Sequence, residues 1–179
     1  MNKISSRRLF IKNMSFVSLG AIYLCSTNDL NALNPKNLFP GYNPYSPYKT
    51  DLRDSKFFGD HLNISGRIYS KKDLSLLEKV RLEVWHLSPI SLKYRHHGKL
   101  EINSNGEYFF LTDFPGKENG KSARIYFKLS NENSSYTTQL LVTRSNAFIT
   151  GDHWKENQIL GDQLLPVKNN TNIQFNLTL

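Results

Sequence analysis

Residues 122–129 read Ser-Ala-Arg-Ile-Tyr-Phe-Lys-Leu, and this octapeptide decides the fold class. Its apolar positions are Ala123, Ile125, Phe127 and Leu129, and each is separated from the next by a polar or amphipathic residue. Successive side chains of a strand point to opposite faces of a sheet. The pattern therefore predicts a strand with one face in a hydrophobic core and the other face turned away from it.

The same two-residue period recurs on both sides of this segment. Further strands are expected at residues 61–69, 80–85, 99–103, 107–112, 136–143 and 171–179, and one helical stretch at 152–160. Between two of these strands lies Ser104-Asn105-Gly106, which is typical of a hairpin turn because Asn-Gly tolerates the positive φ of tight turns. Four aromatic residues at strand period are expected in the core: Trp85, Tyr108, Phe110 and Phe127. About seven short strands joined by turns predict an all-β sandwich.

Composition limits the classes of protein that the chain can represent. It has 179 residues, enough for one domain with a tail, and a single cysteine, which excludes a disulfide framework or a Cys-rich metal site. The net charge is +8, of which residues 1–32 contribute +3. The remaining 19 basic and 14 acidic side chains are scattered, without the basic stripe of a nucleic-acid-binding protein. We therefore expect no nucleic-acid partner.

The first 32 residues have the layout of an export signal. Ser6-Arg7-Arg8-Leu9-Phe10-Ile11-Lys12 precedes a moderately apolar stretch at 14–24. The arginine pair, followed by Phe and Lys, resembles the bacterial twin-arginine signal. The apolar stretch is far shorter than the roughly 20 residues of a membrane-spanning helix. We expect export through the twin-arginine pathway to the periplasm, cell envelope or medium, with no transmembrane anchor.

A second compositional boundary follows the signal. Residues 34–53 contain four prolines and three tyrosines, and each proline removes a backbone donor and disfavours helix at the preceding residue. The sequence therefore predicts three parts: a signal at 1–32, an extended Pro/Tyr-rich arm at 33–58 and the sandwich domain at 59–179.

Five motifs in the expected sandwich resemble those of the intradiol ring-cleavage dioxygenases, the catechol and protocatechuate dioxygenase family. In chain order they are His61–Tyr69, with its Gly-x-Ile ending; Val80–His86; Asn103–Phe110, followed by Thr112 and Pro115-Gly116; Ser122–Phe127; and Thr138–Leu141. No single motif is specific, but their order covers roughly 110 residues of the chain. The resemblance implies a transthyretin-like β-sandwich of Greek-key topology.

The resemblance also implies a site and shows where this chain departs from it. Family members hold ferric iron with two tyrosinates and two histidines, and hard phenolate donors suit Fe³⁺. The two histidine positions, at i and i+2 of one strand, are Arg124 and Tyr126 here. Tyr94 can correspond to the first tyrosine, Lys117–Lys121 contains no second one, and Lys121 stands at the position of an active-site arginine. Arginine does not act as a metal ligand, because it keeps its proton and its positive charge.

Other donors were considered for a rebuilt metal site, namely His96, His97 and His153. His96 and His97 are adjacent, so on a strand they point to opposite faces and do not share an ion. A rebuilt site is therefore the weaker expectation, and solvated or hydrogen-bonded histidines are the alternative.

Three interpretations of function remain open. In the first, the chain is an exported relative of the dioxygenases without the Fe(III) site, and it binds a partner or an anionic or aromatic small molecule at Tyr94, Lys121, Arg124 and Tyr126. In the second, it is an active ferric-iron-dependent dioxygenase that cleaves catechol-type aromatics. In the third, it is a structural module of the cell envelope that forms homo- or hetero-oligomers through the arm.

Overall fold

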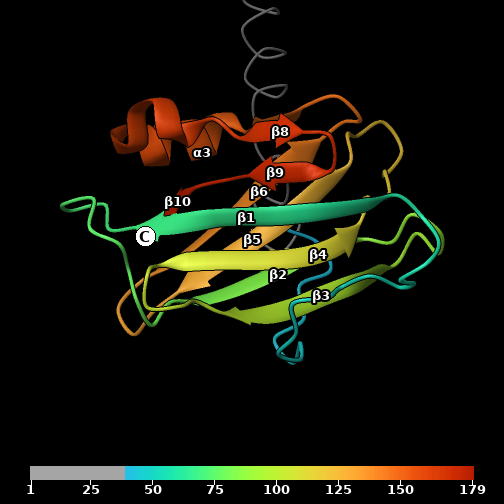
Figure 1. Ribbon diagram of the computed structural model, residues 1–179, viewed down its shortest axis with the longest axis horizontal. Coiled ribbons are helices and arrows are strands. Elements are labelled where there is room, and N and C mark those ends of the chain that lie inside the picture. The colour runs from blue at the N-terminus through green and yellow to red at the C-terminus, as the bar shows by residue number, and fades with distance from the viewer. Residues whose placement is uncertain (1–38) are drawn as a thin grey trace, which may run out of the picture. The chain divides into compact units, whose positions relative to one another are not determined.

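The computed structural model describes residues 39–179, so the predicted signal lies outside the described residues. Residues 41–179 form a β-sandwich of two five-stranded sheets (Figure 1), which confirms the all-β prediction. The strands are β1 (His61–Tyr69), β2 (Arg81–Leu87), β3 (Tyr94–Glu101), β4 (Glu107–Asp113), β5 (Arg124–Ser130), β6 (Ser135–Val142), β7 (Ala147–Ile149), β8 (Val167–Asn169), β9 (Asn172–Gln174) and β10 (Leu177–Thr178).

The chain crosses repeatedly between the two sheets. In the first sheet, β1 pairs antiparallel with β4 on one side and parallel with β9 and β10 on the other, and β8 pairs with β9. The second sheet has the order β3-β2-β5-β6-β7, all antiparallel. After β1 in the first sheet, the chain forms β2 and β3 in the second sheet and then β4 in the first sheet beside β1. Strands that are consecutive in the sequence therefore lie in different sheets.

The alternating apolar residues of segment 122–129 form the inner face of β5. Ile125, Phe127 and Leu129 are fully buried, and the ring of Phe127 lies 5.2 Å from that of Phe175 and 6.1 Å from that of Phe110. Burial of one such side chain contributes roughly 1.5–3 kcal/mol to folding. The period-two pattern of this strand therefore fixes which face of the second sheet meets the core.

The hairpin predicted at Ser104–Gly106 is wrong in its pairing. The turn itself forms, with Gly106 at a φ of +65° and the Asn103 amide donating to the Glu107 carbonyl at 3.2 Å. However, β3 pairs with β2 and β4 pairs with β1, so this turn passes from one sheet to the other. Leu100 and Phe110 must both reach the core, and they do so from opposite layers.

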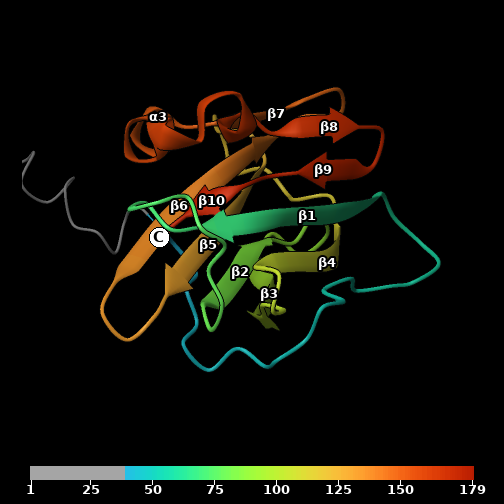
Figure 2. The same ribbon diagram turned by 60° about the vertical axis from the view of Figure 1, so that its left-hand side comes forward.

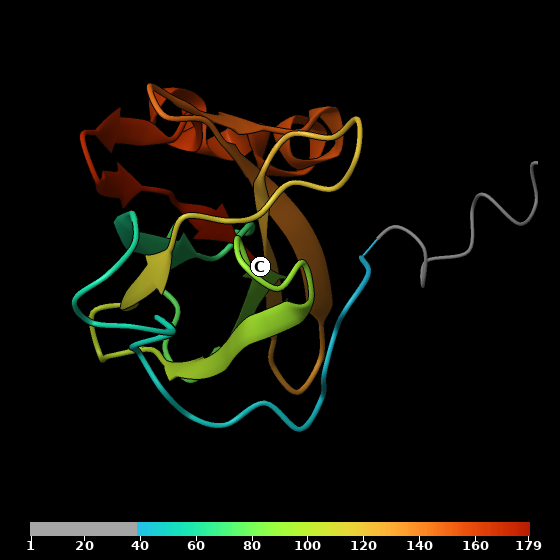
Figure 3. The same ribbon diagram turned by 90° about the vertical axis from the view of Figure 1, so that its right-hand side faces the viewer.

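The extended arm runs along the side of the sandwich where β3 and β4 are the edge strands. The Lys49 amide donates to the Lys99 carbonyl of β3 at 3.1 Å, and the Leu52 amide donates to the Leu111 carbonyl of β4 at 2.8 Å. Figures 2 and 3 show this cyan segment passing around the sheets before it enters β1. The side chain of Leu52 is only 2% exposed and belongs to the core. The arm thus joins the edges of two different sheets.

The expected helical stretch at 152–160 is also present. It forms α3 (Gly151–Asn157), followed by a 3₁₀ segment, Gln158–Leu164, that is interrupted by non-helical backbone at Gly161. The side-chain oxygen of Asn157 accepts a hydrogen bond from the Thr178 amide at 3.0 Å, which holds the helix against the last strand. Neither helical segment, nor any other in residues 39–179, has the length and apolar character that crossing a membrane requires.

His153 of α3 makes the stability of the fold sensitive to acid. Its ring is buried, its Nδ1 lies 2.8 Å from the Tyr136 hydroxyl, and burial, aided by nearby Lys71, lowers its pKa from 6.5 to about 4. Between these pH values the unfolded chain binds a proton that the folded chain does not. The contribution of neutral His153 to the free energy of unfolding is therefore fully present above about pH 6.5 and is lost as the pH falls towards 4.

We expect His153→Gln to reduce this pH dependence. In urea titrations from pH 7 to pH 4, the unfolding free energy of the unmodified protein should decline more steeply than that of the variant, by at most about 1.4 kcal/mol per pH unit. His97→Gln, on β3, is the matched control and should keep most of the slope. Equal slopes for His153→Gln and the unmodified protein would contradict the assignment.

Candidate functional site

The outer face of the second sheet carries the residues expected to form a site. Arg124 and Tyr126 of β5 are two positions apart and point away from the core, as the alternation requires. The Tyr126 ring stacks on Trp85 of β2, with centroids 5.4 Å apart, and lies 6.2 Å from the ring of Tyr94. The structure therefore places Tyr94 and Tyr126 together on this face.

Glu118, which no sequence motif indicated, links Tyr94 to Lys121. The Tyr94 hydroxyl donates to Glu118 Oε1 at 2.5 Å, and Lys121 Nζ donates to Glu118 Oε2 at 2.6 Å. Arg124 Nη1 donates to Gln139 Oε1 of β6 at 3.0 Å. The four predicted residues and Glu118 therefore lie close together, and we call them the tyrosine cluster: Tyr94, Glu118, Lys121, Arg124 and Tyr126.

The electrostatics of the tyrosine cluster keep both phenols protonated at neutral pH. Burial raises the pKa of Tyr94 well above its usual range, and the hydrogen bond to Glu118 raises it further. Burial also raises the pKa of Tyr126, although the hydrogen bond with Tyr94 and the charge of Arg124 act in the opposite direction. The hydrogen bond from Lys121 lowers the pKa of Glu118, which is therefore ionised. The cluster carries two cations and one carboxylate.

The arm covers part of this outer face. Tyr42 packs on Trp85, with ring centroids 5.2 Å apart, and its hydroxyl donates to Glu83 Oε2 at 3.1 Å. Lys128 Nζ lies 2.8 Å from the Tyr42 hydroxyl and 4.2 Å from its ring centroid. Trp85 is buried as predicted, with 2% exposure, but it lies beneath the arm and not between the two sheets. The alternation of apolar residues in a strand does not show whether its outer face is covered by another part of the chain.

The three histidines considered for a rebuilt site lie in separate places. His97 faces outward opposite Trp85, whereas His96 is buried on the inner side opposite His86, as expected for adjacent residues. His153 lies between α3 and β6, in contact with Thr138. The structure brings none of them into the tyrosine cluster.

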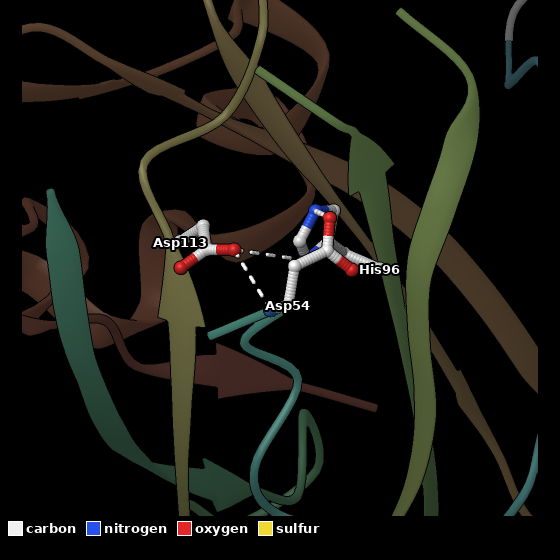
Figure 4. A group of neighbouring side chains, drawn as sticks. All are labelled: Asp54, His96 and Asp113. Atoms are coloured by element: carbon white, nitrogen blue, oxygen red, sulfur yellow. Dashed lines mark hydrogen bonds and ion pairs between the residues drawn. The ribbon is translucent and has the colours of Figure 1, made fainter. Parts of the chain in front are cut away.

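A second cluster, with different residues, lies inside the sandwich at the end where β4 finishes. Among residues 39–179, Asp54, His96 and Asp113 form a group that could hold a metal ion, because one ligand atom from each lies within 4.8 Å of the others (Figure 4). We call this group the Asp-His-Asp triad. His96 is a candidate ligand by sequence, whereas the two aspartates stand in the arm and at the end of β4, where no spacing motif joins them to it.

His86 and Thr112 lie beside the triad. The rings of His86 and His96 stack with centroids 4.4 Å apart and an interplanar angle of 7°. His86 Nδ1 donates to the Leu87 carbonyl at 2.9 Å, and Nε2 lies 2.5 Å from Thr112 Oγ1. Burial, with a contribution from His96, lowers the pKa of His86 to about 3, so this ring is neutral.

Comparison with solved structures identifies the fold. No protein-family model and no curated protein matches the chain. The dioxygenase domain of a dioxygenase–carbohydrate-binding fusion protein from Streptomyces sp. SirexAA-E superposes with a TM-score of 0.58 at 21% identity, covering 78% of this chain and 92% of that one. An intradiol ring-cleavage dioxygenase from Tetranychus urticae gives 0.57 at 14% identity, with 78% and 89% covered.

A third solved structure covers nearly the whole of both chains. The 3-chlorocatechol 1,2-dioxygenase from Rhodococcus opacus 1CP has a TM-score of 0.56 at 17% identity, covering 97% of this chain and 98% of that one. The fold implied by the sequence motifs is therefore confirmed: residues 41–179 have the β-sandwich fold of the intradiol dioxygenases.

Substitution of Gly41 tests whether the arm packs against the tyrosine cluster. Gly41 has a φ of +75°, and an added Cβ would lie 2.1 Å from Tyr94 Cγ, so Gly41→Ala should displace Tyr94 or the arm. Gly120→Ala is the matched control, because Gly120 has a φ of +72° and open space around it. We expect the control to cost about 1–2 kcal/mol of unfolding free energy and Gly41→Ala about 1–3 kcal/mol more. Equal losses in urea titrations would show that the arm does not pack on Tyr94.

Proposed function

We propose that this chain is an exported member of the intradiol dioxygenase family that binds a small anionic aromatic molecule and does not cleave it. The observation that carries the proposal is the tyrosine cluster, three members of which, Tyr94, Arg124 and Tyr126, align by sequence motif with the family's iron ligands. Its two phenols stand beside two cations, Glu118 accepts hydrogen bonds from Tyr94 and Lys121, and Arg124 donates to Gln139.

The donor set of this cluster does not fit ferric iron. Arg124 and Tyr126 replace the two imidazoles, and both tyrosines are held as neutral phenols by burial. The one carboxylate, Glu118, already accepts hydrogen bonds from Tyr94 and Lys121. The cations Lys121 and Arg124 add repulsion towards a trivalent ion. These features support a protein without the family's iron chemistry.

The same features favour an aromatic anion. Arg124 presents a planar, permanently charged group, and Lys121, whose side chain is 52% exposed, adds a second charge at the rim. Glu118 neutralises one of these charges, which leaves a net charge of +1 for a carboxylate ligand. The half-exposed ring of Tyr94 offers an edge on which an aromatic ring can pack. Assembly through the arm is less well supported, because amides of its residues 49 and 52 hydrogen-bond to the chain's own strands.

A two-part experiment tests this function. We expect the purified protein to contain no stoichiometric iron and to leave catechol uncleaved, while benzoate quenches its tyrosine and tryptophan fluorescence saturably. Arg124→Gln should weaken benzoate binding about 10-fold or more, as loss of a charge-assisted contact predicts. Lys117→Gln, in the loop that precedes β5, is the matched control and should bind benzoate almost normally.

The contrary results are distinct. One equivalent of iron with a visible tyrosinate band, or ring cleavage, would establish the active dioxygenase instead. If benzoate does not bind, the proposal that the cluster binds a small anionic aromatic molecule is wrong. The double variant Arg124→His/Tyr126→His, which restores two imidazoles on one strand face, should gain measurable Fe³⁺ affinity by calorimetry; no gain would mean that the cluster does not correspond to the family's iron position.

We also propose that residues 1–32 direct export through the twin-arginine pathway. The support is the Arg7-Arg8 pair followed by a short apolar stretch. Replacing both arginines by lysine keeps the charge but should leave the protein in the cytoplasm, as judged by cell fractionation and immunoblotting. Undiminished export of the lysine variant would reject this route.

A further inference from the structure

The Asp-His-Asp triad is assembled from three separate elements of the fold. Asp54 belongs to the arm, His96 to β3 and Asp113 to the end of β4, so the group exists only when the arm is seated across both sheets. The three side chains lie next to one another, with one ligand atom of each within 4.8 Å of the others (Figure 4). His96 is fully buried, Asp113 has a side chain 7% exposed, and Asp54 forms the more open side at 34%.

The surroundings of His96 fix the tautomer of its neutral ring. Nδ1 lies 2.6 Å from the Leu52 carbonyl oxygen, which can only accept, so Nδ1 carries the proton. In the neutral ring Nε2 therefore presents a lone pair. Within the described part of the chain Nε2 makes no hydrogen bond, and it lies 3.4 Å from Asp54 Oδ2. A buried lone pair that faces a carboxylate is unfavourable unless a cation or a proton lies between them.

Asp113 also has a buried polar atom without a hydrogen-bond partner among the described residues. Its Oδ2 accepts the Asp54 amide at 2.9 Å, but its Oδ1 makes no hydrogen bond among residues 39–179 and lies 3.3 Å from His61 Nε2. An ionised carboxylate that is removed from water is costly unless it is paired or coordinates a metal.

We propose that the Asp-His-Asp triad binds a divalent transition-metal ion, Zn²⁺ being the one that its donors suit. Zinc takes imidazole nitrogen and carboxylate oxygen at about 2.0–2.2 Å in tetrahedral geometry, which places neighbouring ligand atoms about 3.3–3.5 Å apart. The 3.4 Å between His96 Nε2 and Asp54 Oδ2 matches that separation. Mg²⁺ and Ca²⁺ prefer oxygen ligands alone, so the imidazole selects against them.

Several contacts hold the ligands in the manner of a built metal site. A metal-binding histidine commonly donates its second N–H to a backbone carbonyl, as His96 does to Leu52. The stacked His86 ring, fixed by Leu87 and Thr112, prevents His96 from turning away. These contacts hold Nε2 beside Asp54 Oδ2 before any ion arrives, while Asp113 Oδ2 lies 3.8 Å from Nδ1 of the same ring.

A cleft beside the triad provides a path for the ion. It has a volume of about 610 Å³, and its lining includes Gly59 and His61 together with Arg53 and Phe114, which are the sequence neighbours of Asp54 and Asp113. A Cβ added to Gly59 would lie 3.9 Å from both Asp113 Oδ1 and His61 Nε2, so the cleft reaches the edge of the triad. His61 or water can supply the fourth ligand. The site differs from the tyrosine cluster in every residue.

Zinc titration of the full 179-residue chain, freed of metal with a chelator, tests the proposal. We expect about one equivalent of Zn²⁺ by isothermal calorimetry, a higher melting temperature in zinc, no response to Mg²⁺, and visible absorption when Co²⁺ replaces zinc. Asp54→Asn should lower zinc affinity at least about 10-fold. This variant keeps the backbone amide that binds Asp113, and its partial exposure favours normal folding. His97→Gln is the matched control, because it changes the adjacent histidine on the opposite face, and it should bind zinc as the unmodified protein does.

Two outcomes would overturn the proposal. The first is a lack of zinc binding by the unmodified protein at neutral pH; His96 would then be an imidazolium held by two carboxylates, which NMR of the ring nitrogens would show directly. The second is equal zinc affinity in the unmodified protein, Asp54→Asn and His96→Gln, which would place the ion elsewhere. Circular dichroism of each variant confirms that it is folded, so that loss of binding reports on the ligands.

Discussion

The backbone hydrogen bonds between the arm and the two sheet edges are the interaction on which the rest of the structure depends. A sandwich leaves an edge strand on each sheet, and here β3 and β4 stand at the same side with unpaired amides and carbonyls. Residues 47–52 satisfy both in turn, bonding first to Lys99 and then to Leu111. The arm thereby closes the open side, places Leu52 in the core and continues towards β1 in a fixed direction.

Both clusters follow from this closure. Before the arm reaches β3, it places Tyr42 against Trp85 and so covers part of the outer face of β2. After the arm passes β4, it delivers the Leu52 carbonyl and the Asp54 carboxylate to His96. One extended segment without regular secondary structure therefore supplies residues to both sides of the second sheet. This explains how the central strands of that sheet come to be buried on both faces.

The sequence was sufficient to predict the strands but not their partners. Period-two alternation located β1, β5 and β6 almost to the residue, because it reports directly on which side chains leave water. It could not tell that the turn at 104–106 joins different sheets, since a hairpin and a crossover use the same turn residues. The tyrosine cluster was predictable from motifs, apart from Glu118. The triad was not, because Asp54, His96 and Asp113 are far apart in the chain and their convergence depends on the path of the arm.

A single irregularity separates the two clusters. Tyr94 and His96 are two residues apart and would share a face in a regular strand. However, the register between β2 and β3 shifts between His86 and Leu87, so that His86 pairs with His96 and Leu87 pairs with Tyr94, and Arg95 is the extra residue. Such a bulge re-aims the side chains that follow it. It turns Tyr94 outward to Glu118 and leaves His96 inward beside the aspartates, so the phenol and the imidazole cannot share one ligand. The outer face is left with phenols and cations, which suit an aromatic anion, while the inner face holds the imidazole and carboxylates that suit a metal ion.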